Sequence, residues 1–224
     1  MLYGTAILLF LSVSHVLVEQ EFFLKFLLSI ADLEFWNLYF DPIFYAVFAV
    51  IFIVIRHKTL ADSMNDYIKN YKKYLPHVAV SVPVTLVLII ASAICISHFG
   101  IGDSTNEAAL NNAVREAPLI EGITLILIGP FAEEMVFRGF IYEKVRCRIK
   151  DDRKLLIVLW IMITSVLFAA NHFDPEDIKS LKLMASYLIV FFEGLVMTVL
   201  YEKDRNIFSS LLLHCTVNTI AFMK

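Results

Sequence analysis

Long apolar runs, separated by short polar segments, dominate the chain. A bilayer core takes about 20 apolar residues per helix, so the pattern predicts membrane-spanning helices. The runs lie at about 2–18, 35–55, 78–99, 118–141, 155–172, 183–200 and 206–223. The first run has no positively charged start and no small-residue cleavage site, which favours a retained anchor over a signal peptide. The sequence predicts an all-α fold, a polytopic transmembrane bundle of about seven spans.

The composition excludes an ordinary soluble globule. Of the 224 residues, 59% are hydrophobic and 18% are charged, whereas soluble domains are roughly 45–50% apolar. The connecting segments are too short for a second folded domain, so we expect a single integral membrane domain over residues 1–224. A formal net charge of -3 gives no indication of a nucleic-acid partner, and we expect none. Membrane lipid is the expected surrounding.

The basic residues alternate from one connecting segment to the next, which predicts the orientation. Segments 56–77, 142–154 and 201–205 hold 5, 6 and 2 Lys or Arg residues. Segments 19–34, 100–117 and 173–182 hold 1, 1 and 2. Cytoplasmic loops carry the excess of basic residues. The amino terminus is therefore predicted to be cytoplasmic.

Ionisable residues inside apolar runs are costly unless they face protein or water, so they mark candidate functional positions. Glu134 and Arg138 are four residues apart, on one helix face, with the acid first, which favours a side-chain pair. Glu133 points about 100° away from Glu134 and stays available for chemistry. In a competing interpretation, Gly129-Pro130 ends the span and the acids merely begin a cytoplasmic helix.

Three further polar positions interrupt the later runs. His172 follows Phe168 by one turn at the end of a span, where a lone histidine is often only an interface residue. His214 and Asn218 share one face in the middle of the last run, although a hydrogen bond between helices would explain them nearly as well. Glu193 lies in an otherwise lipid-like run and must turn inward.

Carboxylates, two histidines and an asparagine can together add water to a carbonyl, as a base and as donors to an oxyanion. The sequence has no Gly-x-Ser-x-Gly nucleophile elbow, no His-Glu-x-x-His and no phosphate-binding loop. Hydrolysis by activated water therefore fits better than covalent catalysis.

In this order, Glu133-Glu134-x-x-x-Arg138, Phe168-x-x-x-His172 and His214-x-x-x-Asn218 resemble the three motifs of the CPBP family. That family comprises CAAX prenyl endopeptidases of the Rce1 type and bacteriocin-processing or immunity proteins, also called Abi. The resemblance covers about residues 118–224. It implies an intramembrane endopeptidase acting on a lipidated or membrane-associated protein or peptide. The short chain resembles the bacterial members, so a bacterial plasma membrane is the expected location.

The resemblance also implies a role for each motif residue. Glu133, with His172, would activate the attacking water. His214 and Asn218 would hold the oxyanion, while Glu134 and Arg138 brace the site. The family is commonly labelled metalloprotease, and His172, His214 and Glu133 could form a three-ligand zinc site. Asn218 beside His214 fits an oxyanion donor better than a ligand, so the interpretation without a cofactor is favoured.

Two other classes of function stay open. Intramembrane Glu, Arg and His residues also mark proton or ion carriers, although the halves of the chain show no repeat of the transporter kind. A non-catalytic immunity protein that binds a peptide without cutting it is the other alternative.

The hydropathy boundaries create a tension that a structure can test. Glu133 falls near the middle or the cytoplasmic half of its span, whereas His172 falls at the outer end of the next. Straight, flush helices would keep them apart. We therefore predict either that the helix of Glu133 is displaced and runs past Arg138 toward Arg148, or that the helix of His172 extends beyond Phe173. In both cases one water should be able to bridge the two side chains.

Overall fold

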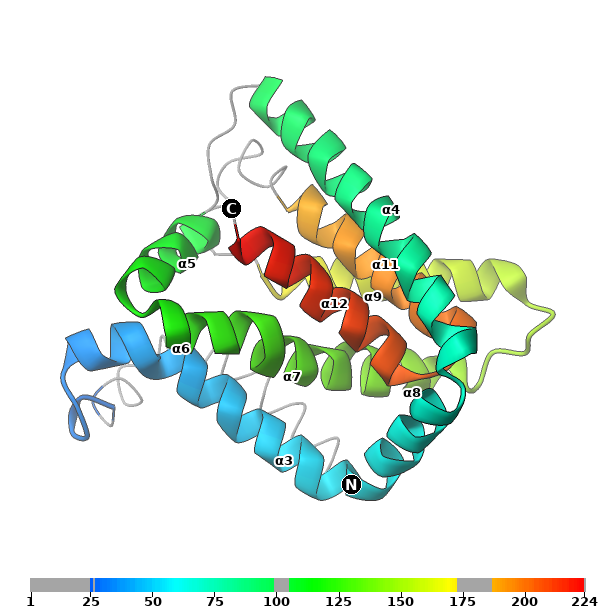
Figure 1. The fold of residues 1–224 in the computed structure, drawn as a ribbon, viewed down its shortest axis with the longest axis horizontal. Helices are drawn as coiled ribbons and strands as arrows, with labels where there is room; N and C mark the ends of the chain where they lie inside the picture. The colour runs from blue at the N-terminus through cyan, green and yellow to red at the C-terminus, as the bar shows by residue number, and fades with distance from the viewer. Residues whose placement is uncertain (1–24, 26, 99–104, 173–186, 224) are drawn as a thin grey trace.

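The computed structural model describes residues 25, 27–98, 105–172 and 187–223, and in these ranges the regular structure is entirely helical. Figure 1 shows a bundle in which α12 (Ile207–Phe222) crosses the helix that carries α7 (Gly129–Val136). The predicted all-α fold is confirmed for the described residues. The first predicted span, 2–18, lies outside them.

In the part of the chain that the structure describes, two helices are long and apolar enough to cross a membrane. They are α3 (Leu33–Lys69), in its part Leu38–Lys69, and α4 (Tyr71–His98). Only 22% and 17% of their most apolar windows are buried within the molecule. Because most of the apolar surface of these windows faces outward, they differ from core helices of a soluble protein. The remaining predicted spans stay predictions; α9 (Lys154–Ala170) and α12 are shorter apolar helices.

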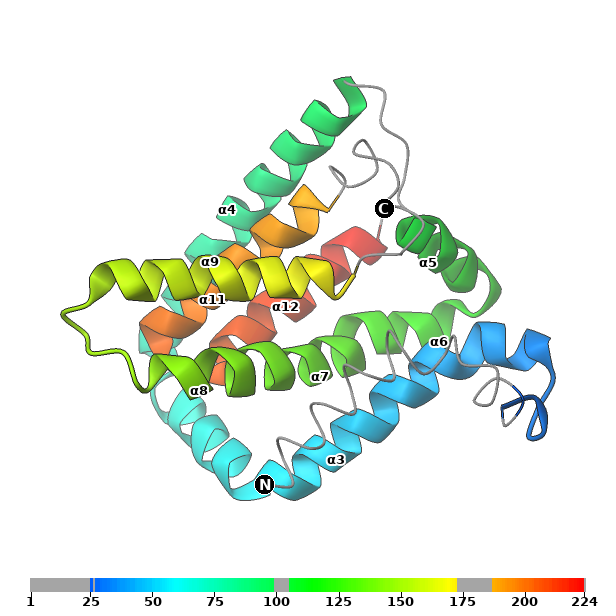
Figure 2. The ribbon, with the colours of Figure 1, turned by 180° about the vertical axis from the view of Figure 1, so that it is seen from behind.

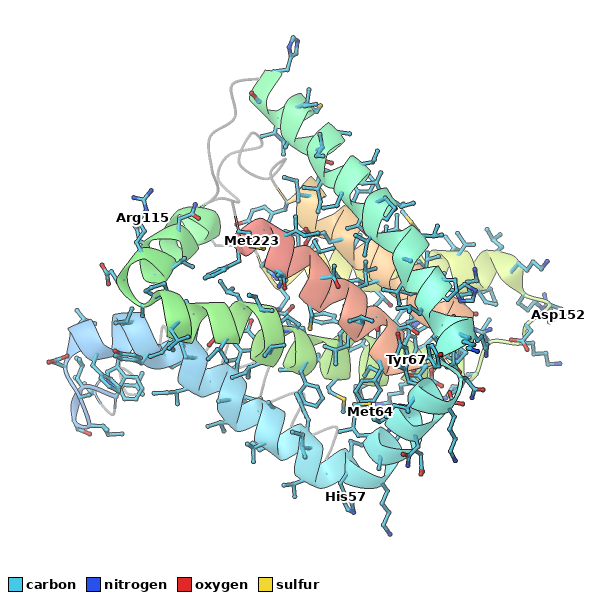
Figure 3. All side chains as sticks on the ribbon, in the orientation of Figure 1. His57, Met64, Tyr67, Arg115, Asp152 and Met223 are labelled. Atoms are coloured by element: carbon cyan, nitrogen blue, oxygen red, sulfur yellow. The ribbon has the colours of Figure 1, made fainter. Side chains whose placement is uncertain are left out.

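Two of the predicted connecting segments contain helices that the hydropathy pattern did not indicate. Segment 56–77 is helical, because α3 continues to Lys69 and α4 begins at Tyr71. Figure 3 shows α3 changing direction near His57, so the apolar span and the basic segment differ in direction within one helix. Segment 100–117 contains α5 (Thr105–Glu116). Hydropathy locates apolar runs, but a polar segment can also be helical. The helical residues outside the apolar runs were therefore not predicted.

A continuous helical stretch from Pro118 to Arg146 carries the acid pair. It consists of α6 (Pro118–Ile123), the π-helical turn η2 (Thr124–Ile128), α7, the π-helical turn η3 (Phe137–Tyr142) and α8 (Glu143–Arg146). We call this stretch the α6–α8 helix. Figure 2 shows it beside α9, to which a short connection joins it. It runs past Arg138 nearly to Arg148, as the first of our two predicted arrangements requires.

Gly129 and Pro130 widen this helix without ending it. Proline has no N–H and cannot make the usual bond to the carbonyl four residues earlier. Here Gly129 N–H donates to the carbonyl of Thr124, five residues back, which is the π-helical pattern. A Cβ on Gly129 would lie 3.0 Å from that carbonyl oxygen, so the tight turn favours glycine. The helix therefore continues through Gly129-Pro130, and the acids do not begin a separate helix as the competing interpretation supposed.

The helix containing Glu193, α11 (Leu188–Asp204), packs between α9 and α4. It ends at Arg205, whose φ of 52° is left-handed. The Asn206 side chain then accepts a hydrogen bond from Phe208 N–H at 3.0 Å and caps α12. This sharp turn directs α12 back across the α6–α8 helix. It therefore determines where along that helix His214 lies.

Candidate active site

Glu133 lies inside the bundle with one carboxylate oxygen facing two imidazoles. Only 6% of Glu133 is exposed. Its Oε2 is 4.0 Å from His172 Nε2 and 3.8 Å from His214 Nε2. Glu133 lies in α7, His172 in the turn that follows α9, and His214 in α12. One water can contact atoms at this separation, so the predicted proximity of Glu133 and His172 is confirmed.

The other oxygen of Glu133 is held by a residue that sequence reasoning missed. Tyr45 Oη, on α3, donates a hydrogen bond to Glu133 Oε1 at 2.9 Å. Tyrosine in an apolar run is ordinary in a membrane protein, and Tyr45 lies outside every motif recognised in the sequence. The sequence alone therefore offered no signal for it.

Glu134 and Arg138 form a buried pair, as their spacing predicts. Arg138 Nη1 donates to Glu134 Oε1 at 2.7 Å, and both side chains are 0% exposed. Arg138 Nη2 donates to the carbonyl oxygen of Gly194 at 2.9 Å. The guanidinium thus joins the acid-bearing helix to α11, at the residue next to Glu193.

His214 links the two acids. Its Nδ1 lies 3.2 Å from Glu134 Oε1, and its Nε2 faces Glu133. An ionised carboxylate only accepts hydrogen bonds, so with Glu134 charged by its pairing with Arg138, the His214 Nδ1 must carry the proton. His214 is 4% exposed. The ring is therefore oriented by a partner that is itself fixed.

His172 is oriented by its own helix. Its Nδ1 lies 2.9 Å from the carbonyl oxygen of Phe168. A carbonyl cannot donate, so Nδ1 carries the proton in this contact. In the neutral imidazole this leaves the Nε2 lone pair directed at Glu133.

The ring of Phe168 packs against the groups that hold the site together. Its centroid is 5.0 Å from the His172 ring and 5.9 Å from the His214 ring, and Arg138 Cζ lies 4.6 Å above it. The residue is 1% exposed. Phe168 thus occupies the space that α9, α12 and the α6–α8 helix share.

Asn218 contacts the backbone of η2, whereas His214, its partner in the motif, faces the two acids. Its Nδ2 donates to the carbonyl oxygen of Leu125 at 2.8 Å, in the π-helical turn η2. A side-chain amide has a second N–H and a carbonyl oxygen, so this bond leaves part of its capacity available. The oxyanion role of Asn218 stays a prediction.

The donor types for zinc are present, but their arrangement does not fit it. His172, His214 and Glu133 are common zinc ligands, which bind at about 2.0–2.2 Å. Separations of 3.8 and 4.0 Å between ligand atoms are wider than a tetrahedral site leaves. Within the described ranges, no group of three His, Cys, Asp or Glu side chains could hold a metal ion. We assign no step to a metal.

Gly194 allows α11 to approach Phe168. A Cβ on Gly194 would lie 2.8 Å from Phe168 Cδ1 and 3.3 Å from Phe168 Cβ. Sequence reasoning considered only its acidic neighbour, Glu193. The site therefore depends on a small residue as well as on polar ones.

Gly194→Ala should lower the free energy of unfolding by about 1–3 kcal/mol through overpacking, and should reduce any activity of the site. Gly122→Ala is the matched control, because its Cβ would meet only the ring tip of Phe222 at 2.9 Å, near the end of α12. Denaturant unfolding in detergent measures both. Equal effects of the two substitutions would contradict this account.

Comparison with known proteins identifies a family for one part of the chain. Residues 115–220 match the model of a family described as type II CAAX prenyl endopeptidase Rce1-like. Comparisons with curated proteins and with solved structures gave no match. The matched range includes the acid pair, both histidines and Asn218, but not Tyr45. Residues 115–220 of this chain therefore belong to the Rce1-like family of type II CAAX prenyl endopeptidases.

Proposed function

We propose that the protein is an intramembrane endopeptidase that cuts a membrane-associated or lipidated substrate with a water activated by Glu133 and His172. The family implies a peptidase. The observation that carries the proposal is the position of Glu133 Oε2, 4.0 and 3.8 Å from two imidazole nitrogens on different segments.

The attacking water would lie between Glu133 Oε2 and His172 Nε2. It donates one hydrogen to the carboxylate and the other to the imidazole lone pair. This directs an oxygen lone pair toward the carbonyl carbon of the scissile amide. Burial of Glu133 supports this role, since a base that is shielded from bulk water works in a medium with few competing hydrogen bonds.

The proton follows the reaction. As the water oxygen bonds to the carbonyl carbon, Glu133 takes a proton, and the carbonyl oxygen becomes an oxyanion. Glu133 then returns the proton to the amide nitrogen, and the carbon–nitrogen bond breaks to give a carboxylic acid and an amine. The acid then passes its remaining proton to the amine, so the products leave as a carboxylate and an ammonium group. One group thus acts as base and then as acid.

His214 and Asn218 would donate to the oxyanion. When both nitrogens of His214 carry protons, Nδ1 donates to Glu134 and Nε2–H is offered near Glu133 Oε2. The second N–H of Asn218 is the other candidate donor. Glu134 and Arg138 would hold this arrangement from behind, because Glu134 Oε1 contacts both Arg138 and His214.

The membrane setting limits the substrate class. A prenylated CAAX tail would approach from the cytoplasmic leaflet, on the side where we predict the basic segments. A bacterial peptide precursor with an apolar segment fits the same site. Both are peptides held at a lipid surface.

Mass spectrometry of peptides released in membranes tests the proposal directly. Membranes with the wild-type protein should contain cleaved peptides that are lacking with Glu133→Gln. Glu116→Gln, an exposed position on α5, serves as the control and should give the wild-type peptides. Identical peptide sets from all three proteins would refute the proposal. Ion flux in liposomes that survives Glu133→Gln would favour a carrier.

Removal of zinc with a chelator is expected to leave the rate of peptide cleavage unchanged. Every proton transfer described above uses side chains of this chain. The measurement is the cleavage rate of metal-free protein, with and without added zinc. Loss of cleavage on chelation and recovery with zinc would contradict this expectation and restore the metal interpretation.

A further inference from the structure

We propose that Tyr45 is a positioning residue for Glu133, so that α3 contributes to the catalytic centre although it lies outside the segment 115–220. This inference rests on the proposed function. Its starting point is the 2.9 Å hydrogen bond from Tyr45 Oη to Glu133 Oε1, which joins residues 88 positions apart.

The hydrogen bond gives the two carboxylate oxygens different surroundings. Oε1 accepts from Tyr45, while Oε2 faces the nitrogens of His172 and His214. Rotation about the last side-chain bond of Glu133 turns the plane of the carboxylate and moves both oxygens away from these partners, and this terminal torsion is intrinsically soft. A donor fixed on another helix selects one orientation. Tyr45 therefore keeps Oε2 directed at the place of the attacking water.

The tyrosine ring is itself held in place. The ring of Phe44 packs against it edge to face, with centroids 5.5 Å apart. A Cβ built on Gly129 would lie 3.9 Å from Tyr45 Cδ1, so the ring also lies close to the backbone of the widened turn. Gly129 begins α7, the helix of Glu133. The widened turn before Glu133 thus also lies close to Tyr45, the hydrogen-bond donor of Glu133.

The hydroxyl group of Tyr45 distinguishes a positioning role from simple packing of the ring. The ring alone would pack α3 against α7 equally well as phenylalanine. Only the hydroxyl reaches Glu133. A substitution that removes this one oxygen therefore separates positioning from packing.

Tyr45→Phe is the test, with Tyr39→Phe as the matched control. Tyr39 lies on the same helix and packs against Phe35. We expect Tyr45→Phe to lower kcat about 10- to 100-fold, since small misplacement of a reacting group costs about that much, and to leave KM within about two-fold. Tyr39→Phe should keep both constants. Wild-type kcat in Tyr45→Phe would overturn the proposal.

An infrared measurement separates this inference from the proposed function. The carboxylate band of Glu133 is identified as the band that Glu133→Gln removes. Tyr45→Phe should shift it, because the carboxylate loses a hydrogen bond, whereas Tyr39→Phe should not. An unmoved band would overturn the positioning role. A shifted band in a protein whose wild type cuts no peptide would overturn only the proposed function.

Discussion

Replacement of Glu133 by glutamine is expected to lower kcat for peptide cleavage by about 10²- to 10⁴-fold, the usual contribution of a general base. Glutamine has the size of glutamate, and its amide oxygen can still accept the hydrogen bond from Tyr45. It cannot take a proton from the water near His172. The fold should therefore survive while the chemical step is lost. Cleavage of a fluorogenic peptide in liposomes measures the change.

Two comparisons make this result specific. Glu116→Gln removes an acid from the exposed end of α5 and should retain wild-type kcat. Unfolding of Glu133→Gln should stay close to the wild-type curve, since glutamine has the same shape and can still accept the hydrogen bond from Tyr45 Oη. If Glu133→Gln keeps more than about a tenth of wild-type kcat, where general bases contribute far more, the acid is not the base.

Arg138→Met should produce the largest loss of stability, about 3–5 kcal/mol, because breaking a buried ion pair leaves an uncompensated charge. Glu134 is 0% exposed, and without Arg138 its charge would lose the guanidinium and keep the His214 contact at 3.2 Å. Methionine fills similar space without a charge. Unfolding by denaturant in detergent, followed by circular dichroism, measures the effect. Reduced folded yield in the membrane is expected as well.

The matched control is Arg115→Met, on the outer side of α5, where Figure 3 shows the side chain pointing away from the bundle. It should change stability by less than about 0.5 kcal/mol. Combining Arg138→Met with Glu134→Gln should recover part of the loss, since a pair in direct contact is not additive. A double variant that loses the sum of the two single effects would show that the pair makes no coupled contribution.

The groups of the candidate site could be recognised in the sequence because each is unusual in its surroundings. Glu133, His172 and His214 interrupt apolar runs, and the i to i+4 spacing of Glu134 and Arg138 is a property of one helix. Local patterns of this kind survive folding. Their convergence on one carboxylate oxygen depends on how the helices pack, so the sequence predicted it only through a family resemblance.

Other features of the fold and of the candidate site depend on tertiary packing, which no local sequence pattern indicates. Gly129-Pro130 is typical of a helix end, yet the chain continues through a π-helical turn, because the Gly129 N–H reaches the Thr124 carbonyl. Tyr45 becomes important only when α3 packs beside α7. Gly194 matters because Phe168 lies against it. Polar helices such as α5 were missed because hydropathy reports burial in lipid, and not helix formation.

An experimental structure of the wild-type protein in lipid, at a resolution that shows ordered water, would reveal whether a water occupies the proposed place. We expect one water in contact with Glu133 Oε2 and His172 Nε2, with the His214 ring beside it and Tyr45 on the opposite oxygen. Side chains of Glu133, His172 and His214 that point apart, or toward the acyl chains, would contradict this expectation.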